Sequence, residues 1–231
     1  MGLETGTEKL EQMNSSFPFS SRSCPICAAL TDALIEHLSR RQKILADDDA
    51  AQNEYAASGG YCPFHTWQLA AFSSSKGIAA GHRQFLEFIA ERMEEFALHA
   101  TAHMKLPVLA NKNGCPLCMF VLGRENELVR SFLWLLDDSG DRLAYAESQG
   151  LCLYHLRMAC AASASADVVR FLLQTAAEQL HKIARAMQGY VRKHNALERH
   201  LLERDEKDAS YRALVKIAGG KQLSVPMDRH G

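Results

Sequence analysis

Apolar residues recur at helical spacing over most of the chain, and no segment requires a β-strand. From Ala28 to Leu38 they follow one another at i, i+3, i+4 and i+7, which is the spacing of one buried helix face. Two longer amphipathic helices are predicted, one over residues 81–105 and one that starts near Ala166 and continues through Val191 into the charged stretch 197–207. A short helix over 209–218 ends before Gly219 and Gly220. The pattern therefore predicts an all-α fold.

The chain contains an internal duplication marked by its cysteines. A CPxC motif occurs at 24–27 and at 115–118, and a GxCxxH motif at 60–65 and at 150–155. The CPxC copies are 91 residues apart and the GxCxxH copies 90 residues apart, and a Tyr-Ala-x-Ser-x-Gly lead-in precedes each GxCxxH cysteine. This predicts two homologous helical repeats, 24–106 and 115–200. A flexible N-terminal arm (1–23) precedes them, and a C-terminal helical extension and tail (201–231) follows.

The duplicated cysteines and histidines are candidate metal ligands. Thiolate sulfur and imidazole nitrogen are the ligands that Zn²⁺ prefers, and four of them complete a tetrahedral structural site. We take each repeat as one Cys/Cys/Cys/His site stapling its own helices, although pairing across repeats would use the same residues. Each motif is expected at a helix N-terminus, where free backbone amides stabilise thiolates. The predicted ligands of two Zn²⁺ ions are Cys24, Cys27, Cys62, His65, Cys115, Cys118, Cys152 and His155.

Other chemistries could use the same residues. Two [4Fe-4S] clusters are the main alternative and would suit a redox or electron-transfer protein, although the dense cysteine run of bacterial ferredoxins is missing. CPxC is also a thiol–disulfide exchange spacing, but its usual context is a βαβ unit. Buried, reduced cysteines would not explain a histidine in register with them. Haem attachment is excluded because Ala28 and Met119, not histidine, follow the CPxC motifs.

The motif order resembles that of a bacterial and archaeal helical domain family of unknown function. Members carry a CPxC pair, a helical spacer and then a pattern similar to Gly-Phe-Cys-x-x-His-x-Trp-x-Leu. Residues 60–69 follow it closely, with Trp67 and Leu69, whereas Arg157 and Ala159 replace these two residues in the second repeat. The resemblance covers most of residues 24–218 and implies a helical metal-binding fold. It implies no activity, because the family has none assigned.

Composition and charge narrow the class of protein. Lys and Arg number 26 and Asp and Glu 27, so the net charge is −1, which argues against a nucleic-acid partner. The first 23 residues show no signal peptide, and no apolar run is long enough to span a membrane. We therefore expect a cytoplasmic protein, where paired cysteines are more often ligands than disulfides. Of the seven cysteines, Cys160 alone lies outside the motifs.

The remaining candidate residues are more consistent with solvated helix faces than with further metal or catalytic sites. A second metal site in a helix bundle could in principle use His99 with His103, or Glu178 with His181. The alternating charges of residues 192–208 suggest an exposed helix or a partner surface. No phosphate-binding loop, nucleophile motif or other catalytic residue is recognisable. We expect a non-enzymatic adaptor or regulatory protein that binds a protein partner.

Overall fold

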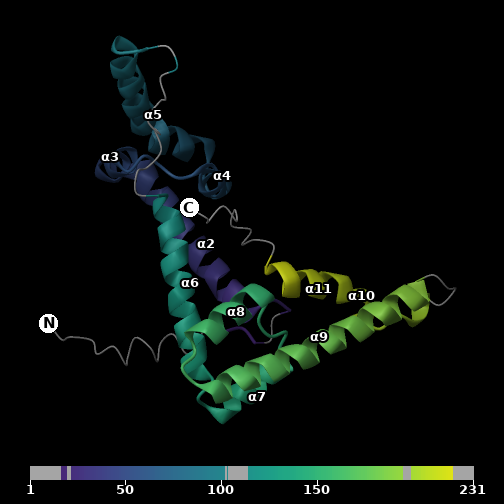
Figure 1. Ribbon diagram of the computed structural model, residues 1–231. Helices are drawn as coiled ribbons and strands as arrows, with labels where there is room; N and C mark the ends of the chain where they lie inside the picture. The colour runs from purple at the N-terminus through teal and green to yellow at the C-terminus, as the bar shows by residue number, and fades with distance from the viewer. Residues whose placement is uncertain (1–16, 20–21, 102, 104–113, 195–198, 221–231) are drawn as a thin grey trace. The chain divides into compact units, whose positions relative to one another are not determined.

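The computed structural model describes residues 17–19, 22–101, 103, 114–194 and 199–220 (Figure 1). These residues form ten α-helices and one 3₁₀ helix, with no β-strand among them, which confirms the all-α prediction. The predicted boundary between the repeats, near 106–113, and most of the N-terminal arm lie outside the described residues. None of the described helices combines the length and the apolarity needed to cross a bilayer.

Two series of four helices follow one another in the order long, short, short, long. The first series is α2 (Pro25–Asp47), α3 (Asp49–Ala57), α4 (Pro63–Ala71) and α5 (Ser75–Leu98). The second is α6 (Pro116–Leu135), α7 (Ser139–Glu147), α8 (Leu153–Ala162) and α9 (Ala166–His194). The 3₁₀ helix η2 (Arg199–Leu201), α10 (Arg204–Lys207) and α11 (Ala209–Ala218) complete the described chain.

Helix starts are encoded locally and alike in both series. Proline occupies the first position of α2, α4 and α6, where its missing N–H would have no helical partner. The N-cap residues of α3 and α7 are Asp48 and Asp138, 90 residues apart. Each carboxylate accepts hydrogen bonds from two backbone amides of the first turn. The same capping chemistry therefore recurs at the repeat spacing.

The described chain divides into two compact units whose limits differ from those of the sequence repeats. Unit 1 comprises residues 1–31 and 125–231, and unit 2 comprises residues 32–124. Both dividing points fall inside long helices, α2 and α6. Unit 1 consequently contains the CPxC motif of the first repeat and the GxCxxH motif of the second, and unit 2 contains the other two.

The core of unit 1 lies between α6, α7 and α9, with α8 and α11 packed along α9 (Figure 1). Phe132 and Tyr145 are fully buried there and meet edge to face. Part of the predicted flexible arm joins this core, because Phe17 packs against Phe132 and Phe19 against Tyr145. The arm is therefore anchored at these two aromatic residues.

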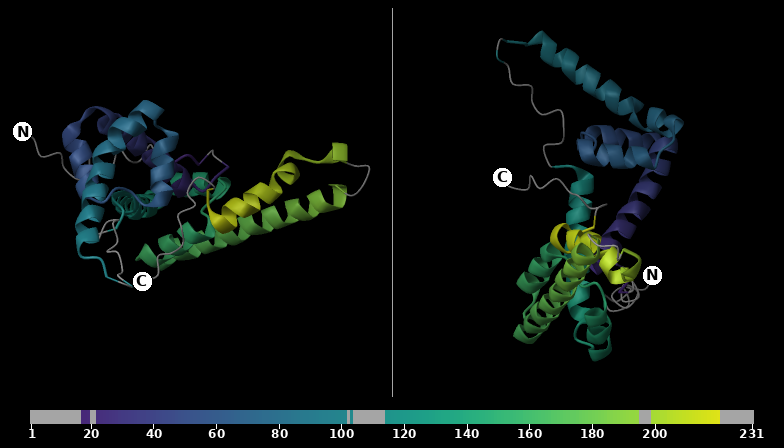
Figure 2. Two further views of the ribbon diagram at one scale, coloured as in Figure 1. Left: turned by 90° about the horizontal axis from the view of Figure 1, so that it is seen from above. Right: turned by 90° about the vertical axis from the view of Figure 1, so that its right-hand side faces the viewer.

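The charged stretch after α9 is also less exposed than its alternating pattern suggested. Helix α10 folds back along α9, as the left-hand view of Figure 2 shows, and Lys193 of α9 pairs with Glu206 of α10 at 2.7 Å. Both side chains are largely covered. The Glu206 carboxylate also caps the backbone amide of Glu203, so part of the predicted partner surface is an internal contact.

The core of unit 2 is built where α3 packs on α5. Tyr55 is buried there and contacts the rings of Tyr61, His82 and Phe85. Gly60, which has a φ of +71°, lies under Phe85 so closely that a Cβ atom would approach its ring to 2.8 Å. A side chain at this position is excluded both by the backbone conformation and by the aromatic cluster.

Candidate metal centres

The four motifs meet in two groups, and each group combines one CPxC motif with one CxxH motif. The unit-1 centre consists of Cys24, Cys27, Cys152 and His155. The unit-2 centre consists of Cys62, His65, Cys115 and Cys118. Within each centre, one ligand atom from every residue lies within 4.8 Å of all the others. All eight residues singled out from the sequence are thus brought together.

The prediction that each centre forms within one repeat is wrong, and the pairing runs across the repeats. Helix length is the physical reason. Cys27 lies in the first turn of α2, a helix of 23 residues that extends for about 34 Å. The nine residues of α3 run for only about 13 Å and are followed by the turn at Gly59 and Gly60, so Cys62 lies beside Cys118 of α6 and not at the start of α2. Helix α6, with 20 residues, separates Cys118 from Cys152 in the same way.

All four motifs have the same local geometry. The first cysteine is the residue just before the helix, and the second ligand is the third residue within it, so both project from one side of the first turn. Cys62 and Cys152 are the N-cap residues of α4 and α8. The predicted placement at helix N-termini is therefore confirmed. Four helix starts direct their positive dipole ends and free amides towards the sulfur atoms.

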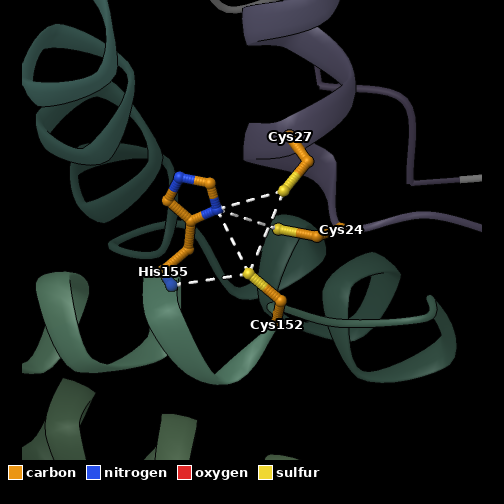
Figure 3. Close-up of side chains that lie close together, drawn as sticks. All are labelled: Cys24, Cys27, Cys152 and His155. Carbon is orange, nitrogen blue, oxygen red and sulfur yellow. Dashed lines mark hydrogen bonds between the residues drawn. The ribbon is translucent and has the colours of Figure 1, made fainter. Parts of the chain in front are cut away.

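The unit-1 centre has the size of a tetrahedral cage around one ion (Figure 3). His155 Nδ1 lies 3.4 Å from the sulfur of Cys24 and 3.3 Å from those of Cys27 and Cys152. The sulfurs of Cys27 and Cys152 are 3.9 Å apart. Metal distances of about 2.3 Å to sulfur and about 2.0 Å to nitrogen correspond to tetrahedral edges of roughly 3.8 Å and 3.5 Å. The side chains are thus spaced as a single zinc-sized ion requires.

The unit-2 centre repeats these dimensions. His65 Nδ1 lies 3.2 Å from the sulfur of Cys62, 3.5 Å from that of Cys115 and 3.4 Å from that of Cys118. The sulfurs of Cys62 and Cys118 are 3.9 Å apart, the same spacing as the corresponding pair in unit 1. The two centres therefore offer the same donor set in cages of the same size.

The electrostatics of the cages call for a cation. At Cys115, burial raises the pKa, but hydrogen bonds from His65 and from backbone amides outweigh it and lower the pKa to about 6. Burial and the neighbouring charges of Cys115 and Cys62 raise the pKa of Cys118 to about 12. Without a counter-charge, the thiolate of Cys115 therefore opposes deprotonation of Cys118 beside it. A divalent ion would compensate the mutual repulsion and keep every sulfur deprotonated.

The unit-1 centre shows the same division of charge. Hydrogen bonds from Cys24 and Cys27 hold the pKa of Cys152 far below its usual value, whereas burial raises the pKa of Cys24. Burial lowers the pKa of His155, but hydrogen bonds with the sulfurs of Cys152 and Cys27 and with Glu125 prevail and raise it to about 11. A positive charge is thus favoured at Nδ1, where a bound metal ion would replace the proton.

A buried carboxylate orients the unit-1 histidine. Glu125 of α6 is only 4% exposed, and its Oε1 atom accepts a hydrogen bond from Nε2 of His155 at 3.2 Å. Its other oxygen accepts a hydrogen bond from the Tyr154 hydroxyl at 3.1 Å. An imidazole held in this way keeps its proton on Nε2 and directs the Nδ1 lone pair into the cage. The aligned position of the first repeat is Leu34, which cannot accept a hydrogen bond.

Glu125 was not predicted from the sequence, although a signal was present. It occupies the buried face of α6 together with Val121, Leu128 and Phe132, at positions four residues before it and three and seven after. A charged residue in such a stripe needs a buried partner. In the alignment of the two repeats, Glu125 corresponds to Leu34, so the second repeat has a carboxylate where the first has a leucine.

Replacing Glu125 by leucine should weaken the unit-1 centre selectively. We expect the affinity of one of the two bound metal ions to fall by roughly 10- to 100-fold, the usual effect of losing such a partner. Competition with a chelator measures this directly. Glu127→Leu is the matched control, because Glu127 lies two residues along the same helix and is exposed. Equal affinities in the Glu125→Leu variant and the native protein would refute the orienting role.

The other residues weighed from the sequence lie outside the two centres. His99, His103, Glu178 and His181 are all exposed, and none belongs to a group of ligands within the described part of the chain. Cys160 is a free, partly exposed thiol on α8 and is not a member of either centre.

Comparisons of the chain with protein-family models, curated proteins and solved structures found no match. The resemblance to the bacterial and archaeal helical family thus depends on the motifs themselves. A helical fold with two Cys₃His groups agrees with it.

Proposed function

We propose that the protein is a non-enzymatic zinc protein in which one Zn²⁺ ion occupies each centre and fixes the helices around it. The observation that carries the proposal is the pair of matching cages, each with three sulfur donors and one nitrogen donor at tetrahedral spacing. Four protein ligands fill every position of a tetrahedral ion and leave none for a substrate, which is typical of structural zinc sites.

The spacing of the donors supports single ions rather than clusters. A [4Fe-4S] cluster places iron and sulfide atoms between the cysteine sulfurs and therefore requires a wider cage than one ion does. The 3.9 Å sulfur–sulfur separations correspond to the smaller cage. Two [4Fe-4S] clusters are the alternative, and metal analysis distinguishes them from zinc. Free cysteines throughout the described chain agree with a reducing compartment, which we propose to be the cytoplasm.

In each unit the ion would cross-link helix starts that the chain alone does not join. The first turns of α2 and α8 would be held together in unit 1, and those of α4 and α6 in unit 2. The cysteines supply negative charge and sulfur donors, and His155, oriented by Glu125, supplies the nitrogen donor in unit 1. The chemistry that the ions contribute is structural, since binding energy at such sites becomes folding energy.

We further propose that the protein acts by binding another protein, as an adaptor or regulator, and that it belongs to the helical family that its motifs resemble. Several large apolar side chains are exposed on unit 2, among them Trp67 at 78% and Leu86 at 64%. On unit 1, α11 exposes Tyr211, Leu214 and Ile217 at three-residue spacing. Exposed apolar groups of this kind are typical of protein interaction surfaces, and the near-neutral charge favours a protein over a nucleic acid.

Metal analysis of the purified protein tests the proposed function. We expect a colourless protein with two zinc ions per chain, after both aerobic and anaerobic purification. A brown protein with visible absorption near about 400 nm and about four irons per centre would replace zinc by iron–sulfur clusters. Purified protein without stoichiometric metal would exclude both the zinc ions and the iron–sulfur clusters.

A further inference from the structure

The two centres share their ligands but differ in their surroundings. All four ligands of the unit-1 centre are buried, whereas Cys62 and Cys118 of the unit-2 centre are partly exposed. By the alignment of the repeats, Cys62 corresponds to Cys152 and Cys118 to Cys27. The same two positions of the motif are therefore covered in one unit and accessible in the other.

The cover of the unit-1 centre is the backbone turn that follows α11. The amide of Gly220 donates a hydrogen bond to the sulfur of Cys27 at 3.5 Å. A Cβ atom on Gly219 would lie 3.4 Å from the Cys27 sulfur and 3.7 Å from the Cys152 sulfur, so the backbone of this turn rests directly on both. Gly219 has a φ of +80°, a conformation that glycine adopts without strain. This turn belongs to the C-terminal extension, which the chain contains only once.

A buried lysine holds α11 in place over the unit-1 centre. Lys216 is 1% exposed, and its Nζ atom donates to the carbonyl oxygen of Leu151 at 3.0 Å and to Oε1 of Gln179 at 2.8 Å. Leu151 immediately precedes Cys152, and Gln179 lies on α9. The helix that ends in the Gly219–Gly220 turn is thus fastened next to the ligand that the turn covers.

Hydrogen bonding to the two histidines also favours tighter metal binding in unit 1 than in unit 2. His155 is oriented by Glu125, but Leu34 takes the corresponding position of the first repeat and offers His65 no acceptor. Loss of such a partner typically weakens metal binding. Accessible sulfurs and an imidazole that lacks a counterpart of Glu125 both favour exchange of the ion, and these two features depend on different parts of the chain.

We propose that the unit-1 centre retains its ion as a structural site, whereas the unit-2 centre is an exchangeable zinc site that takes up and releases its ion much more readily. This inference rests on the proposed zinc-binding function. The partly exposed sulfurs of Cys62 and Cys118 would be the ligands displaced by a thiol or a nitrogen ligand from solution. An incoming thiol would pass its proton to the departing thiolate, and with a nitrogen ligand the thiolate would take its proton from water, so no electrons are transferred.

Release of zinc from the native protein to an excess of a chromogenic chelator tests this inference. We expect one equivalent to leave quickly and the second roughly 10- to 100-fold more slowly, in line with the loss of affinity expected for an unsupported site. An alkylating reagent added after the fast phase should label Cys62, Cys115 and Cys118, whereas Cys24, Cys27 and Cys152 should become labelled only in the slow phase. Cys160 should react in both phases and reports that labelling works.

A truncation that ends the chain at Ala218 removes the covering turn and should bring the slow phase closer to the fast one. Release of two equivalents at one rate, or labelling of the unit-1 cysteines first, would overturn the inference while leaving zinc binding intact. If no zinc were present before the chelator is added, the proposed function itself would fail.

Discussion

A double variant that combines Cys27→Ser with Cys152→Ser should retain one metal ion per chain, whereas Cys27→Ser with Cys62→Ser should retain none. The first pair removes two ligands of a single centre, and the second removes one ligand from each centre. A Cys₃His site that has lost a thiolate no longer presents four ligands, and serine is a poor substitute for a soft sulfur donor. Both variants lack two cysteines, so a difference in metal content between them reports which cysteines share a site.

Pairing within the repeats would give the opposite result, because Cys27 and Cys62 would then share one site. Metal content by elemental analysis, normalised to protein concentration, distinguishes the two outcomes. Cys160→Ser is the matched control and should keep both ions, since its sulfur belongs to neither centre. Complete loss of metal in the Cys27→Ser, Cys152→Ser variant would contradict the assignment.

Removal of both ions should unfold much of the tertiary structure. The unit-1 centre joins residues 131 positions apart and the unit-2 centre residues 56 positions apart. Cross-links over loops of this length stabilise a fold by about 4 to 5 kcal/mol each when they restrict the unfolded chain as a disulfide does. A single domain is stable by only about 5 to 15 kcal/mol, so losing both cross-links removes most of that margin.

Thermal unfolding followed by circular dichroism, with and without a strong chelator, measures this effect. We expect the cooperative transition to disappear or to move sharply downwards, and to return when Zn²⁺ is added back. A chelator already saturated with zinc is the control for effects of the reagent. An unchanged transition after verified removal of both ions would show that the helices pack without metal.

Local features of the sequence accounted for the helices well. Helix α11 covers 209–218, and α9 begins at Ala166, as their periodicity predicts. Helix α5 begins at Ser75 rather than near Gly81, because Ser74 caps it by accepting a hydrogen bond from the amide of Gly77. Gly81 lies inside the helix, where its missing side chain allows close contact with Leu45. The candidate metal ligands could also be identified from the sequence, because thiols and imidazoles at fixed spacing have few uses other than metal binding.

The features that could not be predicted from the sequence depend on distances between helices that lie far apart along the chain. The ligands of one centre come from different repeats because α2 and α6 are long, a geometric consequence that motif spacing does not display. The burial of Lys216 and of Glu125 was hidden for a related reason. Charged residues are rarely buried, and their partners, Gln179 and His155, lie 37 and 30 positions away. The asymmetry between the centres therefore became visible only in the structure.

X-ray absorption at the metal edge of the native protein tests the central claim most directly. The account predicts zinc with about three sulfur neighbours at about 2.3 Å and about one nitrogen neighbour at about 2.0 Å, averaged over two equivalent shells. It also predicts no scattering from a second metal atom nearby. An iron edge with metal–metal scattering, or a shell of four sulfurs without nitrogen, would contradict two single-ion Cys₃His centres.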